Sequence, residues 1–149
     1  MSISILIGCD IGGVVRDMIT GDPVDNSIES IKQIIHRGYR IMFISKCKSG
    51  YQERVTEWLK RWDLDELPRE FCQEYAQKFE IARRHTINIM IDDKIQVLSL
   101  LPDHIVKIWF CSEEQKISGT RKYQPELFEK FKVARNWNDV LDVLDALHS

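Results

Sequence analysis

The sequence predicts an α/β fold in which a doubly wound parallel sheet is the middle of three layers. Short β-branched apolar runs such as 3–9 and 87–91 lack polar alternation, so we expect helices to cover both of their faces. Helical stretches alternate with these runs, which favours parallel strands joined by right-handed crossovers. The length of 149 residues fits a single domain, 1–149.

The spacing of apolar and turn residues predicts each element in order. The first strand is 3–9, and the first helix has Asn26 as its cap and Gly38 after its end. A second strand at 39–44 precedes a helix that Ser49 caps and that runs to Trp62. The remaining predictions are strands at 69–73, 87–91, 105–111 and 132–134, helices at 76–84 and 137–147, and a loop at 112–124 that could cover the site with Lys116, Arg121 and Lys122.

The composition limits the partners of the protein. The 21 basic and 23 acidic residues give a net charge of −2, which disfavours nucleic acid and anionic membranes as partners. No apolar run is long enough to span a bilayer, and we expect a cytoplasmic protein. Four widely spaced cysteines without metal-ligand spacing are expected to be reduced thiols: Cys9, Cys47, Cys72 and Cys111.

Polar side chains follow three of the predicted strands directly. These are Asp10, Ser45 and the pair Asp92 and Asp93. In a doubly wound sheet, ligands bind at the carboxyl ends of the strands. We therefore expect these residues, although far apart in the sequence, to form one site.

Four motifs in this order resemble those of the haloacid dehalogenase (HAD) superfamily of hydrolases, over essentially the whole chain. An apolar strand ending in Asp10-Ile11-Gly12-Gly13-Val14 matches the first motif, and the strand ending at Ser45 matches the second. Lys78 matches the third, and the strand ending in Asp92-Asp93 the fourth. Two features are distantly similar to those of 5′(3′)-deoxyribonucleotidases. They are the spacing from Lys78 to Asp92 and the segment Trp137-Asn138-Asp139-Val140 that opens the last predicted helix.

The resemblance implies a phosphatase site in which Asp10 is the nucleophile and forms an aspartyl-phosphate. Mg²⁺ is implied, with Asp10, the carbonyl of Gly12, Asp92 and Asp93 as its ligands. The phosphate would be held by the remaining site residues: Ser45, Lys78 and the backbone of Gly12 and Gly13. The implied substrate is a phosphomonoester, on a small molecule or a macromolecule.

One position departs from the motif, because Gly12 stands where the family usually has a second Asp that protonates the leaving group. Loss of such a group typically slows a reaction by about 10²–10⁴-fold. The residues leave open a slowed phosphatase, with Asp17 of the next turn as a substitute acid, and dehalogenase-type chemistry. They equally leave open a non-catalytic phosphate- or partner-binding pseudoenzyme.

Two further expectations concern architecture. The segments after Val14 and after Lys46 are too short for a sizeable cap domain. Capless relatives take large substrates or close the site with a neighbouring subunit, so a homo-oligomer is one expected assembly. A two-component receiver domain, which shares the fold class, is disfavoured because receivers carry the acid pair early in the chain, whereas here it comes late.

Overall fold

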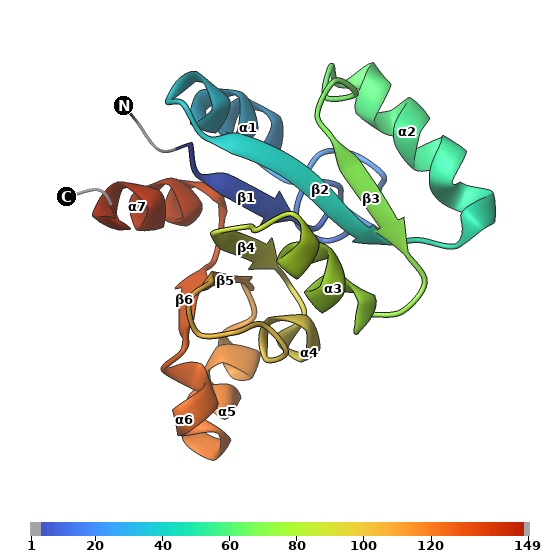
Figure 1. Cartoon of the computed structure of the whole chain (residues 1–149). Helices are drawn as coiled ribbons and strands as arrows, with labels where there is room; N and C mark the ends of the chain where they lie inside the picture. Colours follow the sequence, from blue (N-terminus) through green and yellow to red (C-terminus); the bar gives the residue numbers. More distant parts are fainter. Residues whose placement is uncertain (1–3, 148–149) are drawn as a thin grey trace.

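A computed structural model describes residues 4–147 and confirms the predicted fold class. Six strands form one sheet in the order β3-β2-β1-β4-β5-β6, and every neighbouring pair is parallel (Figure 1). Residue 3, the predicted start of the first strand, lies outside the described part. The strands are β1 (Leu6–Cys9), β2 (Arg40–Lys46), β3 (Arg69–Cys72), β4 (Ile89–Asp92), β5 (Val106–Phe110) and β6 (Phe131–Ala134).

Helices cover both faces of the sheet because side chains along each strand alternate between two apolar clusters. In β2, for example, Phe43 packs into one cluster and Ile44 into the other. The first cluster lies against α1 (Ser27–His36), α2 (Gln52–Arg61) and α7 (Trp137–Leu147). The second lies against α3 (Gln77–Arg84), α4 (Ile95–Leu98), α5 (Glu114–Tyr123) and α6 (Pro125–Phe128).

The strand order has a switch point between β1 and β4. The chain builds β1, β2 and β3 outward in one direction and then returns to place β4 on the other side of β1. The crossovers that leave the carboxyl ends of β1 and β4 therefore diverge, which opens the usual ligand crevice of such sheets. Asp10 follows β1 at this point, and Asp92 and Asp93 end β4 and begin its loop.

The structure corrects four local predictions. Most of the predicted loop at 112–124 is helical, because Glu114–Tyr123 form α5. Strand β2 continues to Lys46, so Ser45 lies within the strand. Asn26 precedes α1 in a left-handed conformation and makes no side-chain cap hydrogen bond. Ser49 begins a short 3₁₀ helix (η1, Ser49–Tyr51) and does not cap α2.

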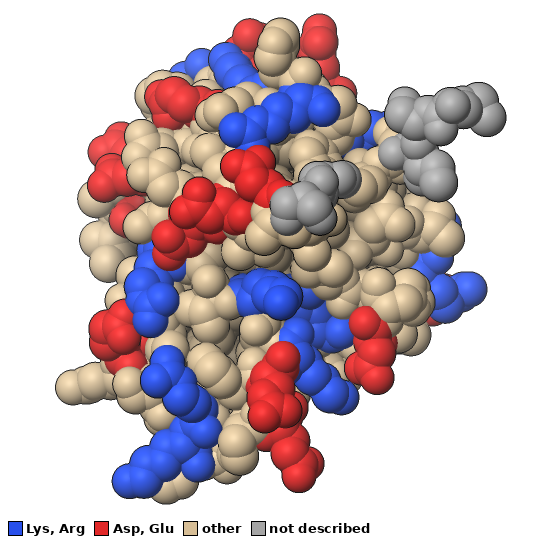
Figure 2. Space-filling view, turned by 90° about the vertical axis from the view of Figure 1, so that its left-hand side faces the viewer, with Lys and Arg blue, Asp and Glu red and all other residues tan. Residues whose placement is uncertain are grey.

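Within residues 4–147, no large cap interrupts the fold. The segment between β1 and α1 is a compact turn with a short bridge between Arg16 and Pro23. On the face shown in Figure 2, acidic and basic side chains are intermingled. Among the described residues, no helix has both the length and the apolar composition needed to cross a membrane.

Two buried tryptophans anchor the loops that leave β1 and β4. The Nε1 of Trp137, at the start of α7, donates a 2.8 Å hydrogen bond to the carbonyl of Val14. The Nε1 of Trp109 in β5 donates a 3.3 Å bond to the carbonyl of Asp93. Each bond satisfies a loop carbonyl and fixes the backbone beside the strand ends.

We expect Trp137→Phe to lower the free energy of unfolding by about 1–3 kcal/mol, because it leaves the Val14 carbonyl without this donor. Trp62→Phe is a matched control, since the Trp62 Nε1 is buried without a hydrogen-bond partner among the described residues. Its removal relieves an unsatisfied donor and should change stability less. Urea unfolding measures both variants, and an equal loss in the two would contradict the anchoring role.

Candidate active site

Asp10 is fixed at the switch point by its own backbone. Its amide donates a 2.9 Å hydrogen bond to the carbonyl of Ile91 in β4, so the residue after β1 is tied to the neighbouring strand. The amides of Val14, Val15 and Arg16 all donate to the carbonyl of Ile11, which turns the chain sharply after Asp10. The carboxylate is left almost fully buried at the carboxyl end of the sheet.

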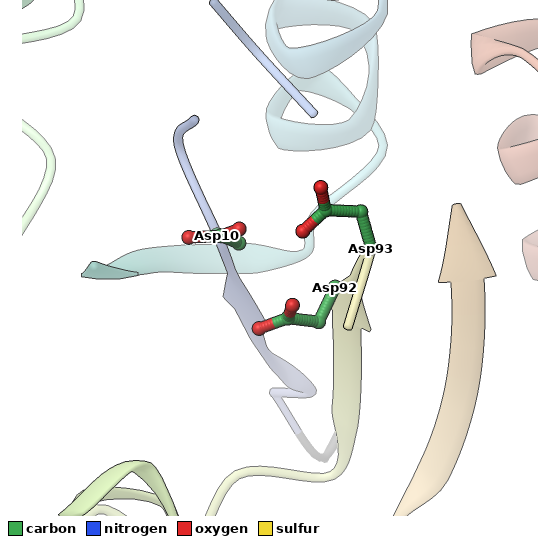
Figure 3. A group of neighbouring side chains, drawn as sticks. All are labelled: Asp10, Asp92 and Asp93. Atoms are coloured by element: carbon green, nitrogen blue, oxygen red, sulfur yellow. The ribbon is translucent and has the colours of Figure 1, made fainter. Parts of the chain in front are cut away.

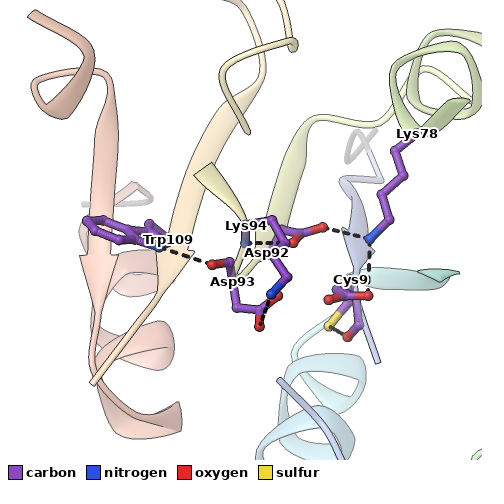
Figure 4. Close-up of polar contacts among 7 residues, drawn as sticks. Cys9, Lys78, Asp92, Asp93, Lys94 and Trp109 are labelled. Atoms are coloured by element: carbon purple, nitrogen blue, oxygen red, sulfur yellow. Dashed lines mark hydrogen bonds and ion pairs between the residues drawn. The ribbon is translucent and has the colours of Figure 1, made fainter. Parts of the chain in front are cut away.

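Lys78 joins the carboxyl ends of β1 and β4 through charge. Its Nζ donates to Oδ2 of Asp92 at 2.8 Å (Figure 4). The same Nζ donates to Oδ1 of Asp10 at 3.1 Å. The side chain comes from the second residue of α3 and is 1 % exposed, as deeply buried as Ala82 of the same helix. A buried ammonium needs such partners, because an unpaired charge in the interior is strongly unfavourable.

Burial and charge shift the pKa values of this group. Burial alone lowers the pKa of Lys78, but the carboxylates of Asp10 and Asp92 outweigh it and raise the pKa above its ordinary value. Burial raises the pKa of Asp10 well above its usual range, and the Asp92 carboxylate adds to the rise while Lys78 opposes it. Burial also raises the pKa of Asp92, against the effect of Lys78. The raised pKa values mean that Lys78 does not fully offset the cost of burying these carboxylates. When ionised, Asp10, Asp92 and Asp93 together carry more negative charge than the single positive charge of Lys78.

Asp92 and Asp93 are adjacent but differ in their contacts. Both oxygens of Asp92 are engaged, Oδ2 by Lys78 and Oδ1 by the amide of Lys94 at 2.9 Å. Asp93 has only a 4.0 Å ion pair from Oδ2 to the half-exposed Lys94. Its Oδ1 is buried and has no hydrogen-bond partner among the described residues. Asp92 thus positions Lys78, whereas Asp93 has an oxygen free to bind a further group.

The three carboxylates fit a divalent cation. Asp10, Asp92 and Asp93 each place an oxygen within 4.8 Å of the others. Figure 3 shows the side chains of Asp92 and Asp93 extending from the end of β4 toward Asp10. Hard cations such as Mg²⁺ prefer oxygen ligands, and one would balance the excess negative charge while using the unpartnered Oδ1 of Asp93.

Comparison with solved structures identifies the fold. A D,D-heptose 1,7-bisphosphate phosphatase from B. bronchiseptica, complexed with magnesium and phosphate, matches with a TM-score of 0.70 at 12 % identity, over 94 % of this chain and 97 % of that one. The chain has the fold of HAD-superfamily phosphatases. A phosphoserine phosphatase in apo form also matches, with a TM-score of 0.58 at 15 % identity, over 94 % and 98 % of the two chains.

The HAD-like fold does not by itself name the reaction. An E. coli ADP-heptose heptosyltransferase matches 99 % of this chain with a TM-score of 0.58 at 18 % identity, over 47 % of its own length. No protein-family model matches the sequence, and no curated protein matches it. None of the three structures is a deoxyribonucleotidase, so that finer similarity stays a prediction.

The glycines after Asp10 allow close approach of the acid pair. Gly13 has a positive φ of 82°, which favours glycine, and an added Cβ would lie 2.6 Å from Oδ2 of Asp93. Gly12 precedes it, and an added Cβ there would lie 2.9 Å from the sulfur of Met18.

Ser45 is buried near the carboxyl end of β2, and no described residue hydrogen-bonds its hydroxyl.

Other candidate residues have local partners in the structure. The basic residues expected on a covering loop lie on or beside α5 and have local partners, Lys116 with Glu113, and Arg121 with the ring of Phe128. Lys122 lies against the ring of Tyr123. The hydrogen bonds of Trp109 and Trp137 were not predicted. Nothing in the sequence around either residue indicates that its indole N–H would bind the carbonyl of a loop far along the chain.

We expect Mg²⁺ to raise the Tm of the wild-type protein, because a ligand bound only by the native state stabilises it by about 2.7 kcal/mol at 100 times its Kd. Gly13→Ala should abolish this response, since the new methyl group would displace Asp93. Gly119→Ala is the control, as an added Cβ there meets nothing within 4 Å. Thermal unfolding with Mg²⁺ and with EDTA gives the comparison, and an unaltered response in Gly13→Ala would exclude Asp93 from the metal site.

Amide substitution of the two adjacent acids should affect different properties, stability for Asp92 and Mg²⁺ binding for Asp93. Asp92→Asn leaves one acceptor oxygen for two donors, the Nζ of Lys78 and the amide of Lys94, and should lower the metal-free stability by about 1–3 kcal/mol. Asp93→Asn should change metal-free stability by no more than about 0.5 kcal/mol but remove the Mg²⁺ response. Urea unfolding and Mg²⁺ calorimetry separate the two effects. Equal behaviour of the variants would show that the acids do not divide these roles.

Proposed function

We propose that this chain is a Mg²⁺-dependent HAD-type phosphohydrolase with Asp10 as its nucleophile. The observation that carries the proposal is the buried carboxylate of Asp10, held by Lys78 at the switch point of a phosphatase-like sheet and facing Asp93. A carboxylate in this position can attack phosphorus and form an aspartyl-phosphate. The magnesium and phosphate in the heptose bisphosphate phosphatase structure are consistent with that chemistry.

The metal would be held by Asp10, the carbonyl of Gly12, Asp93 and Asp92. When bound, Mg²⁺ supplies positive charge that lets an anionic nucleophile approach an anionic phosphoryl group. Gly13 keeps the backbone close enough to Asp93 for a shared ion. This assignment accounts for the unpartnered Oδ1 of Asp93.

Lys78 and Ser45 would orient the reacting groups. Lys78 binds Oδ1 of Asp10, which leaves Oδ2 for bond formation to phosphorus. Its ammonium also adds positive charge beside the phosphoryl group, the main electrostatic requirement of phosphoryl transfer. The hydroxyl of Ser45 has no described partner and can donate to a phosphoryl oxygen, as can the amides that follow Gly12.

The proposed substrate is a phosphorylated small molecule, as for the phosphatases of similar fold. We place the protein in the cytoplasm, because its four cysteines are free and three of them are buried thiols. The short turn between β1 and α1 leaves the site without a cap of its own, so closure by a second copy of the chain remains part of the proposal.

A second candidate function is a non-catalytic phosphate-binding module. Gly12 favours it, because this residue can offer its carbonyl but has no side chain to transfer a proton. The residues that hold the metal and the phosphate would then bind a phosphorylated ligand without hydrolysing it.

Asp10→Asn should abolish Mg²⁺-dependent hydrolysis of an activated aryl phosphate and of any other phosphomonoester that the wild type hydrolyses, because an amide cannot act as the nucleophile. It should not lower metal-free stability, since a neutral amide is cheaper to bury than a carboxylate and still accepts from Lys78. Phosphate release with Mg²⁺ or EDTA, together with thermal unfolding, tests both statements.

Activity retained in Asp10→Asn would exclude Asp10 as the nucleophile. Phosphate binding by calorimetry in a wild-type protein that hydrolyses none of these substrates would favour the binding module. Lys94→Gln is a matched control, since its half-exposed side chain makes only a 4.0 Å ion pair.

A further inference from the structure

At Gly12, the turn that follows Asp10 has no side chain that can transfer a proton. Gly12 is two residues after the nucleophile, and the space beside it is taken by Met18, whose sulfur, Cγ and Cε lie 2.9, 3.5 and 3.7 Å from the position of an added Cβ. A thioether carries no exchangeable proton and is only a weak acceptor. The position at which phosphatases of the HAD superfamily usually carry the proton-transferring Asp therefore has no proton-transferring group in this chain.

The nearest carboxylate along this turn is already engaged. Oδ1 of Asp17 accepts hydrogen bonds from the amides of Ile19 at 2.8 Å and Thr20 at 3.0 Å. These contacts stabilise the ionised carboxylate, and the backbone bonds from Thr20 and Ile19 lower the pKa of Asp17. Asp17 thus folds back on its own turn as an anion and has no proton to donate at neutral pH.

Without a proton donor, the site can act only on substrates whose leaving group is stable as an anion. An alkoxide is a poor leaving group and needs protonation as the bond to phosphorus breaks. A carboxylate, a phosphate or a phenolate leaves as a stable anion without it. Resting on the phosphohydrolase function above, we propose that this site takes acyl phosphates, phosphoanhydrides and other activated phosphoryl donors, not alkyl phosphomonoesters, and that its phosphoenzyme is slow to hydrolyse.

The first step requires no external proton. An oxygen of Asp10 forms a bond to phosphorus while the bond from phosphorus to the leaving oxygen breaks. The electron pair of that bond stays on the leaving oxygen, which departs as an anion. The phosphoryl group remains on Asp10 as an acyl phosphate.

The second step is where the missing base has its effect. Water attacks phosphorus, the bond from phosphorus to Asp10 breaks, and its electron pair returns to the carboxylate. Both hydrogens of the water leave on the product as H₂PO₄⁻. Without a base at Gly12 to take a proton from the attacking water, this step is slower by about 10²–10⁴-fold. The phosphoenzyme should therefore accumulate.

The test compares three donors in Mg²⁺ buffer: p-nitrophenyl phosphate, acetyl phosphate and the alkyl ester glycerol 3-phosphate. With p-nitrophenyl phosphate, we expect a burst of p-nitrophenolate close to one equivalent of enzyme, followed by slow turnover. Acid quenching and intact mass measurement should find one phosphoryl group on the wild-type protein and none on Asp10→Asn. Glycerol 3-phosphate should give neither.

Gly12→Asp and Gly12→Asn form the matched pair, because both add nearly the same bulk against Met18 but only Asp transfers protons. Met18 is 66 % exposed and can move aside for either. Relative to Gly12→Asn, Gly12→Asp should raise the ratio of kcat/KM for glycerol 3-phosphate over p-nitrophenyl phosphate by about 10²–10⁴-fold and remove the burst.

Three results would overturn the inference while leaving the phosphohydrolase function in place. These are wild-type turnover of glycerol 3-phosphate comparable to that of acetyl phosphate, turnover without a burst, or no difference between Gly12→Asp and Gly12→Asn. A wild-type protein that forms neither product nor phosphoenzyme with any donor would instead overturn the proposed function itself.

Discussion

The contact on which the site depends is the buried bridge from Lys78 to Asp10 and Asp92. Two carboxylates at adjacent strand ends repel each other in a medium of low dielectric, and burial makes the charge of each less favourable. One ammonium from α3 reduces both effects and ties the helix to the ends of β1 and β4. Because it neutralises only part of the charge, the cluster stays suited to a cation.

The surrounding structure fixes the positions of the loops that carry Asp10 and Asp93. Trp137 and Trp109 each use an indole N–H to hold a carbonyl of the loops that carry Asp10 and Asp93. Gly13 then lets the two loops approach more closely than any larger residue allows. These restraints come from α7, β5 and the β1 turn, so the geometry is set by separate parts of the chain. Such rigidity is what electrostatic catalysis requires, since groups that are already oriented need not reorganise during the reaction.

Predictions from sequence succeeded where the local pattern was strong and failed where tertiary contacts decided. Buried strands ending in acids were evident, because continuous β-branched runs have few other uses. Helix α5 was missed since only Ile117 and Thr120 on it are buried, which leaves little apolar periodicity. Asn26 and Ser49 have good capping chemistry, yet the backbone places neither side chain to cap an α-helix.

The sequence by itself determined the α/β class, the order of the strands along the chain and which polar residues follow them. It also determined the absence of a side chain at Gly12, which no folding can supply. Only the tertiary structure decided that Asp92 binds Lys78 while Asp93 keeps a free oxygen, because adjacent identical residues differ only in what surrounds them. It likewise decided that Asp17 turns back on its own amides and that Met18 lies beside Gly12, since both depend on the path of the turn after β1.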